Sequence, residues 1–367
     1  MTFASNTQFR KRPTPDPESG SGLSLLLSEG QQRVASLPTD SVVAVFGAPA
    51  SGKTTALKTL LRRCLEPNSQ GVVELQPGQA MVLTASRTSA NQLRDDLAIE
   101  LQLATPGPLA RTLASFAFGV LRHSAIAEGG RLPELISGSE QDRILNQVIT
   151  DALASGASEQ WPKHITEVVL GLNGFRAELR DLITVCLEHG LSPADLRQQG
   201  VAFEKPEWIA AADLFEDYLR VLSGPSFENR HDASSLLVAA AGWLSTNADW
   251  PAVLGDLKLL LVDDAQELTP AANRLLRAIA SRGCGLVVFG DPDVSTLGFR
   301  AADPRSMSEL IESITSQQGK SVALAPIFLE ANPHARTTRI AAVMSRVSSL
   351  IDTAKAGRQR RQPPISP

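Results

Sequence analysis

The chain has 367 residues, of which 43% are hydrophobic and 20% charged, an ordinary composition for a globular protein of two or three domains. A net charge of −4 and a pI near 5.8 exclude a surface that is basic throughout, although they allow a local basic groove. No apolar run approaches the ~20 residues of a membrane span, so we expect a cytoplasmic protein that does not contact membranes. The three cysteines lie far apart in apolar runs, which predicts buried free thiols at Cys64, Cys186 and Cys284.

Residues 1–22 are rich in Pro, Ser, Gly and Thr and poor in large apolar side chains, so they predict a disordered tail. Organised structure is expected from Leu23 onward, beginning with a short helix over residues 25–34. Gln31 lies in this helix. Its amide is suited to reading an adenine ring, whereas a single glutamine on a helix is more often solvated, and both interpretations stay open.

The segment SVVAVFGAPASGKTT, residues 41–55, predicts a strand, a glycine-containing loop and the start of a helix. It matches G-x-x-x-x-G-K-[ST], so we expect the loop to bind nucleotide phosphates. Lys53 supplies a positive charge for the β- and γ-phosphates, and the Thr54 hydroxyl is suited to ligate Mg²⁺. A turn without a ligand is the alternative interpretation. The predicted nucleotide-binding residues are Gly47, Ala48, Pro49, Ala50, Ser51, Gly52, Lys53, Thr54 and Thr55.

Strand and helix patterns alternate after this loop, which predicts βαβ units and a parallel sheet, hence an α/β fold class. Strands are expected over residues 81–85 and 106–112, with helices over 87–101 and through Phe116. Between residues 126 and 256 the strand signals disappear and helical patterns follow one another, beginning with residues 139–153. The aromatic side chains of this stretch are expected to anchor a core rather than stack on DNA. An inserted all-helical domain is therefore predicted.

The α/β pattern returns with a continuous apolar strand, residues 257–262, that ends in Asp263 and Asp264. Carboxylates at the carboxyl end of a buried parallel strand belong in the crevice where such sheets bind ligands. Asp263 is the expected Mg²⁺ partner of Thr54, and Asp264 is the candidate that orients an attacking water. The alternative is an acidic turn without function.

The motifs stand in the order Gly47 to Thr54, Thr84 to Ala90, Arg111 to Phe116, Val262 to Gln266 and Gly290 to Arg300. In this order they resemble the N-terminal, ATP-binding half of UvrD/Rep-like superfamily 1 DNA helicases, most closely the AdnA-like branch, over about residues 23–340. The resemblance implies a P-loop RecA-like parallel-sheet domain with an inserted all-helical domain. It further implies ATP and Mg²⁺ as cofactors and single-stranded DNA as a partner.

The same resemblance implies roles for single residues. Gln31 takes the place of an adenine-reading glutamine, and Gln266 that of a glutamine coupling nucleotide state to the DNA path. Arg300 matches a residue linked to the γ-phosphate, which makes Asp264, Gln266 and Arg300 the implied catalytic set. The implied DNA contacts are Arg87, Thr112, Ser115 and the base-stacking Phe299.

The sequence also departs from the family pattern. Asp264 stands where the family has glutamate and is one methylene shorter, and Val294 replaces a glutamine expected near the γ-phosphate. Leu297 replaces an aromatic residue, Ala114 a histidine, and an ungapped alignment puts Ala335 in place of an arginine. Most of a second motor domain is expected to be missing, because one further helical pattern is followed only by a basic tail. These departures predict ATP binding with slow hydrolysis and weak binding to single-stranded DNA.

The expected function is therefore that of a DNA helicase homologue in repair or recombination, impaired or dependent on a second helicase subunit. The alternative is a non-catalytic ATP- and DNA-binding regulatory subunit of a helicase assembly. A small GTPase-like switch is disfavoured, because no N-K-x-D motif is present. The expected domains are a tail (1–22), the RecA-like domain in two parts (23–125 and 257–328), the helical insertion (126–256), and a remnant of a second motor domain with a basic tail (329–367).

Overall fold

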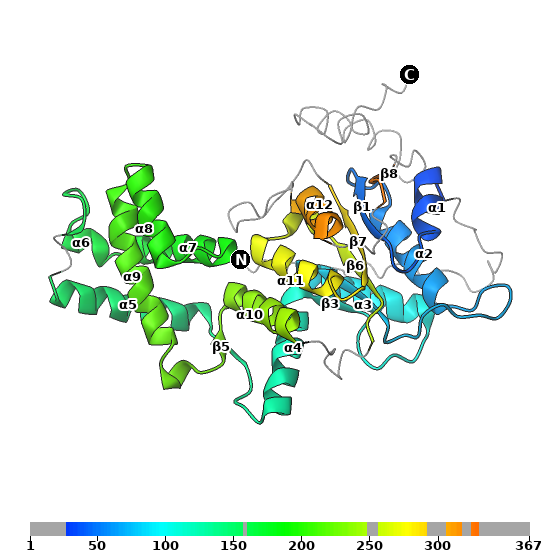
Figure 1. The fold of residues 1–367 in the computed structure, drawn as a ribbon, viewed down its shortest axis with the longest axis horizontal. Helices are drawn as coiled ribbons and strands as arrows, with labels where there is room; N and C mark the ends of the chain where they lie inside the picture. The colour runs from blue at the N-terminus through cyan, green and yellow to red at the C-terminus, as the bar shows by residue number, and fades with distance from the viewer. Residues whose placement is uncertain (1–26, 157–159, 248–255, 292–305, 318–323, 330–367) are drawn as a thin grey trace, which may run out of the picture.

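The computed structural model describes residues 27–156, 160–247, 256–291, 306–317 and 324–329 (Figure 1). Within them, six strands form one sheet in the order β3-β2-β6-β7-β1-β8, and every neighbouring pair is parallel. All the strands therefore end at the same edge, which we call the strand-end edge. The strands are β1 (Val42–Gly47), β2 (Ala80–Thr84), β3 (Ala110–Thr112), β6 (Leu259–Asp263), β7 (Gly285–Gly290) and β8 (Ile327–Leu329).

Helices cover both faces of this sheet (Figure 1). Side chains alternate along β1, so that Val42 and Ala44 belong to one hydrophobic core and Val43 and Val45 to the other. Burial on both faces explains why the strands read as continuous apolar runs. One face carries α1 (Glu29–Ala35), α2 (Lys53–Leu65) and α3 (Arg87–Leu101); the other carries α4 (Leu113–Glu128), α10 (Ala233–Thr246), α11 (Pro270–Ala280) and α12 (Ser306–Gln317).

A second group of helices lies beside the sheet domain and has a hydrophobic core of its own (Figure 1). We call it the helical block; it consists of α5 (Gly138–Ala154), α6 (Glu167–Leu170), α7 (Asn173–His189), α8 (Pro193–Ala202) and α9 (Pro206–Leu222), followed by the 3₁₀ turn η2 (Pro225–Phe227). The chain enters the block through β4 (Glu134–Leu135) and leaves it through β5 (Arg230–His231). These two short strands pair in parallel, with Glu134 opposite Arg230.

Helix α10 lies within residues 126–256, the predicted helical insertion, but it packs on the sheet and not in the core of the helical block. Its buried side chains, including Leu236 and Leu244, belong to the core that covers the sheet, together with α4 and α11. Glu188, near the end of α7, joins the helical block to the same helices. The Ser234 hydroxyl donates to Glu188 Oε1 over 2.6 Å, and the Ala271 amide donates to Oε2 over 3.0 Å. The buried carboxylate thus ties α7 to the starts of α10 and α11.

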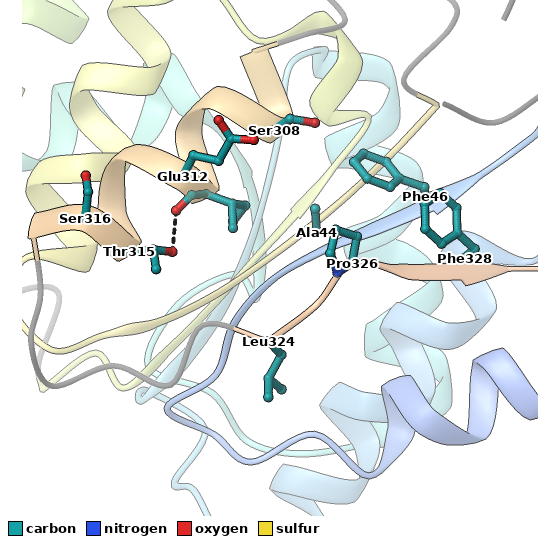
Figure 2. Close-up of a pocket in the computed structure, with 10 residues that line it drawn as sticks. Ala44, Phe46, Ser308, Glu312, Thr315, Ser316, Leu324, Pro326 and Phe328 are labelled. Atoms are coloured by element: carbon teal, nitrogen blue, oxygen red, sulfur yellow. Dashed lines mark hydrogen bonds between the residues drawn. The ribbon is translucent and has the colours of Figure 1, made fainter. Parts of the chain in front are cut away.

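A cavity of about 560 Å³ opens between α12 and the β1–β8 side of the sheet (Figure 2). Its floor is apolar, with the rings of Phe46 and Phe328 5.4 Å apart, and Glu312 and Thr315 of α12 line the opposite wall. The cavity lies on the sheet face covered by α12, whereas the helix that follows β1 covers the other face. The three cysteines are buried and free, as predicted. Among the described helices, none is long and apolar enough to span a membrane.

Candidate functional site

The strand-end edge brings together residues that are far apart in the sequence. The loop after β1 and the carboxylates after β6 lie on either side of the end of β7, because β7 separates β1 from β6 in the sheet. Across this gap the Thr54 hydroxyl donates to Asp263 Oδ2 over 3.2 Å, although 209 residues separate the two positions. The pair predicted to hold Mg²⁺ is thus adjacent in space.

The loop between β1 and α2 needs both of its glycines. Gly52 has φ +83°, a left-handed conformation that disfavours a side chain, and a Cβ here would overlap Gln31 Nε2. A Cβ on Gly47 would overlap the Ser51 hydroxyl. Gly52 is also the N-cap of α2 and provides no side-chain cap, so the first N–H groups of the helix remain directed at the loop. Such a helix start is suited to an anion.

Two side chains in the loop are arranged as a phosphate site requires. Lys53 Nζ donates to the carbonyls of Gly47 and Ala48 over 2.7 and 3.2 Å, which places its charge inside the bend of the loop. The Ser51 hydroxyl is buried and has no hydrogen-bond partner among the described residues. Leaving a buried hydroxyl unpaired is unfavourable, and a phosphate oxygen in the loop would satisfy it. The residues present therefore fit a nucleotide phosphate.

Asp263 is 8% exposed, and burial, reinforced by the neighbouring charge of Asp264, raises its pKa to about 6. The Asp264 N–H, the Lys53 charge and the Thr54 hydroxyl oppose this shift. A divalent cation would favour the ionised carboxylate. The described residues contain no group of three or more potential metal-binding side chains, but Mg²⁺ at phosphoryl-transfer sites uses one or two carboxylates together with substrate phosphates. A hydroxyl beside one carboxylate fits that mode of binding.

Asp264 is held at both its backbone and its side chain. It adopts φ 55° and ψ 40° at the start of the 3₁₀ turn η4 (Ala265–Glu267), and its N–H donates to Asp263 Oδ1 over 3.0 Å. Its carboxylate accepts a hydrogen bond from the Ser89 hydroxyl of α3 over 3.2 Å. The sequence did not identify Ser89 as a functional residue. Its only indication there was its place in the motif Thr84 to Ala90, which follows β2.

The two glutamines contact the edges of this site. Gln31 is buried rather than solvated: its Oε1 accepts from the Ser28 N–H over 3.0 Å, and its Nε2 donates to the Gly52 carbonyl over 3.3 Å. The solvated interpretation was therefore wrong, and Gln31 lies against the phosphate loop. Gln266 Oε1 accepts from the Asp291 N–H over 3.2 Å, which links η4 to the end of β7.

Three of the residues predicted to contact DNA, Arg87, Thr112 and Ser115, lie at or just after the ends of β2 and β3. Arg87 is exposed at the first position of α3. Thr112 is the N-cap of α4 and accepts from the Ser115 N–H over 3.1 Å, while Ser115 itself is exposed. Thr112 thus has a structural use of its own. Phe299 and Arg300, together with the substituted positions Val294, Leu297 and Ala335, lie outside the described residues.

Comparison with known proteins adds two findings. The family model of the UvrD/REP helicase N-terminal domain matches residues 27–315. The ATP-dependent DNA helicase srs2 of Schizosaccharomyces pombe is 22% identical over 296 residues, which cover 78% of this chain. The chain spans 32% of the length of that relative. The family-model match over residues 27–315 includes the phosphate loop, both carboxylates and the helical block.

Proposed function

Because the chain belongs to the UvrD/Rep helicase family, we propose that it is an ATP·Mg²⁺-binding motor domain that engages single-stranded DNA during repair or recombination. The observation that carries the proposal is the Thr54–Asp263 hydrogen bond, which joins the phosphate loop to the carboxylate of β6. This contact puts a hydroxyl and a carboxylate beside a helix start that is open to an anion. A nucleotide bound together with Mg²⁺ uses all three.

In this proposal each residue of the loop has a defined task. Lys53 exchanges the Gly47 and Ala48 carbonyls for the β- and γ-phosphates, and Ser51 donates its hydroxyl to a phosphate oxygen. Thr54 and Asp263 would hold the cation, which would supply positive charge that neutralises the phosphates. Gln31, already in contact with Gly52, extends the site toward the adenine.

Hydrolysis is proposed to be slow. Asp264 is shorter than the glutamate of the family, and one oxygen of its carboxylate accepts a hydrogen bond from Ser89 of α3. A water-positioning group that is displaced by about 1 Å loses much of its effect. A second helicase subunit that supplies the remaining groups would restore turnover. The competing role is a regulatory subunit that binds ATP and DNA without hydrolysis, and the Ser89–Asp264 contact favours it over a fully active enzyme.

The proposed DNA contacts lie beside the nucleotide site. Arg87 and Ser115 are exposed at the ends of neighbouring strands, where they can contact successive phosphates. Phe299 is proposed to stack on a base, a contact worth roughly 1–3 kcal/mol. Contacts this few give weak binding that falls as salt rises.

Binding of a fluorescent ATP analogue with and without Mg²⁺ tests the central proposal. Lys53→Ala should weaken binding by about 100-fold, since one charge and its hydrogen bonds to the phosphates are lost. Lys58→Ala is the matched control, because Lys58 lies on the same helix but pairs with Asp96 and Glu100 over 2.9 and 2.8 Å. Equal affinities for wild type and Lys53→Ala, with both proteins folded by circular dichroism, would refute the nucleotide site.

A phosphate-release assay with and without single-stranded DNA separates the enzyme from the regulatory subunit. We expect slow release that Lys53→Ala abolishes and that DNA stimulates little. Release at the background rate of Lys53→Ala would favour the regulatory role. Fast, strongly DNA-stimulated release by the chain alone would contradict the proposed impairment.

A further inference from the structure

The hydroxyls of Ser86 and Ser89 form a chain of hydrogen bonds that ends on Asp264. The Ser86 hydroxyl donates to Ser89 Oγ over 2.9 Å. Ser89 Oγ then donates its single hydrogen to Asp264 Oδ2 over 3.2 Å. Because a hydroxyl has one hydrogen to donate, the direction of the chain is fixed and its last acceptor is the carboxylate. Beside this chain, the Thr84 hydroxyl donates to the backbone carbonyl of Ser86 over 2.8 Å and so holds the turn before α3.

The order of the strands shows which way this contact turns the carboxylate. β2 and β6 are neighbours, with Thr84 paired to Asp263, so α3 starts directly beside Asp264. The phosphate loop follows β1, which lies on the other side of β6 beyond β7. Ser89 and the phosphate loop are therefore on opposite sides of Asp264, and the hydrogen bond draws the carboxylate away from the loop.

The backbone of Asp264 is held in place, so only its side chain can change position when Ser89 binds or releases it. Its N–H is bound to Asp263 Oδ1, and its left-handed conformation is fixed by the turn into η4. We propose that Ser89 is a positioning residue that withholds Asp264 from the attacking water, an inference that rests on the proposed function. In the reaction, the water oxygen bonds to the γ-phosphorus as the bond from phosphorus to the β,γ-bridging oxygen breaks. Asp264 accepts the proton of the water and passes it to the released phosphate, leaving ADP.

The same contact links hydrolysis to DNA. Asp264 lies at the N-terminal end of α3, where the helix dipole favours a negative charge, and Arg87 is exposed in the first turn of the same helix. A DNA phosphate paired with Arg87 brings a second negative charge to the first turn of α3, where it repels the carboxylate. Bound DNA therefore weakens the hold of Ser89 on Asp264, and loss of that hold favours DNA in return, because coupling between two sites is reciprocal.

The first test needs no nucleotide. The affinity of the full chain for a fluorescent oligo-thymidine is measured by anisotropy at low salt for wild type, Ser89→Ala and Ser89→Thr. Ser89→Ala should bind about fivefold more tightly, the change that one hydrogen bond of ordinary strength produces, while Ser89→Thr keeps its hydroxyl and matches wild type. Thr88→Ala, an exposed neighbour on the same turn, is the control. Unchanged or weaker binding by Ser89→Ala overturns the inference.

The second test measures phosphate release by the same proteins. Ser89→Ala should raise kcat by about fivefold with KM for ATP unchanged, and the small stimulation that DNA gives the wild type should be lost. A lower kcat, an unchanged kcat, or no turnover in either protein overturns the inference. ATP binding measured in parallel keeps the two proposals apart, because lost turnover with intact Lys53-dependent binding removes the role of Ser89 and leaves the nucleotide site standing.

Discussion

The two halves of the strand-end edge are built differently. On the side of β1 and β6, contacts join distant parts of the chain and include a buried carboxylate, as Thr54 and Asp263 show. On the side of β2 and β3, the polar groups bond mainly within one turn, as Ser86 does with Ser89 and Thr112 with Ser115. The first half is a partly buried set of long-range contacts, and the second is a surface of helix caps and single exposed charges. Substitutions should therefore have large effects in the first half and small ones in the second.

The largest effect should come from placing a side chain at Gly52 of the phosphate loop. Gly52→Ala combines a positive φ with a Cβ that overlaps Gln31 Nε2, so we expect ATP binding to fall by about 100-fold and stability by at least the ~1–2 kcal/mol of left-handed strain. Binding of the fluorescent analogue and thermal melting measure the two effects.

Gly71→Ala is the matched control for Gly52→Ala. Gly71 has φ +76°, but nothing lies within 4 Å of its Cβ position. It should lose stability through strain alone and keep its ATP affinity. If both variants bind ATP as wild type does, the close packing of the loop has no functional consequence.

A smaller effect, on the pH dependence of stability, is expected from Asp263, the buried carboxylate of the first half. The pKa of Asp263 in the folded protein, about 6, exceeds its ordinary value of 3.8, so the folded state binds the proton more tightly. Its contribution to stability is therefore full below about pH 4 and is lost as pH rises through about 6, by up to roughly 3 kcal/mol. Urea unfolding between pH 4.5 and 7.5 measures this effect. As pH rises, the free energy of unfolding of the wild type should fall relative to that of Asp263→Asn.

The effect of Mg²⁺ on ATP affinity should follow the opposite trend. Mg²⁺ requires the ionised carboxylate, so the gain in affinity on adding the metal should shrink below about pH 6. A pH-independent gain, or an Asp263→Asn variant with an unchanged gain, would exclude Asp263 as a metal-binding residue.

On the surface half, Thr112→Ala should lower stability by about 1 kcal/mol, because the Ser115 N–H at the start of α4 loses its cap. Thr112→Ser retains the hydroxyl and should melt like wild type. ATP binding should be unaffected in both variants. A loss of ATP affinity in Thr112→Ala would show that the two halves are not separate.

The smallest effect on folding is expected at Arg87. Arg87→Ala should change stability by less than about 0.5 kcal/mol, since the side chain is exposed. The affinity for single-stranded DNA should fall a few-fold, and the slope of log affinity against log salt should decrease by about 0.7. Arg94→Ala, on the same helix but next to Asp95, is the control. Equal salt slopes for Arg87→Ala and wild type would remove Arg87 from the DNA path.

The features that the sequence predicted well are local. The helix expected over residues 87–101 is α3, Arg87–Leu101, and the strand, loop and helix around Gly47 lie where the motif predicts them, because caps and periodicity are written within a few residues. Placing Asp263 beside Thr54 also succeeded, since parallel strands end at one edge.

What the sequence did not predict depends on long-range packing. Helix α10 has an ordinary apolar stripe, which does not reveal whether it covers the sheet or the helical block. The strands β4 and β5 have two residues each, too few for a pattern. The contact between Ser89 and Asp264 joins side chains 175 positions apart, and nothing in the residue types of a serine and an aspartate predicts that these two would meet.

The paired strands β4 and β5 bring the two ends of the helical block close together. Because Glu134 lies opposite Arg230, the two ends of the helical block are separated by one ladder spacing, about 4.8 Å, which is little more than the distance between consecutive Cα atoms. A deletion between these residues can be closed by a short linker without moving any strand of the sheet. The block, with its separate core, therefore has the geometry of an insertion whose length can change without altering the path of any strand in the sheet.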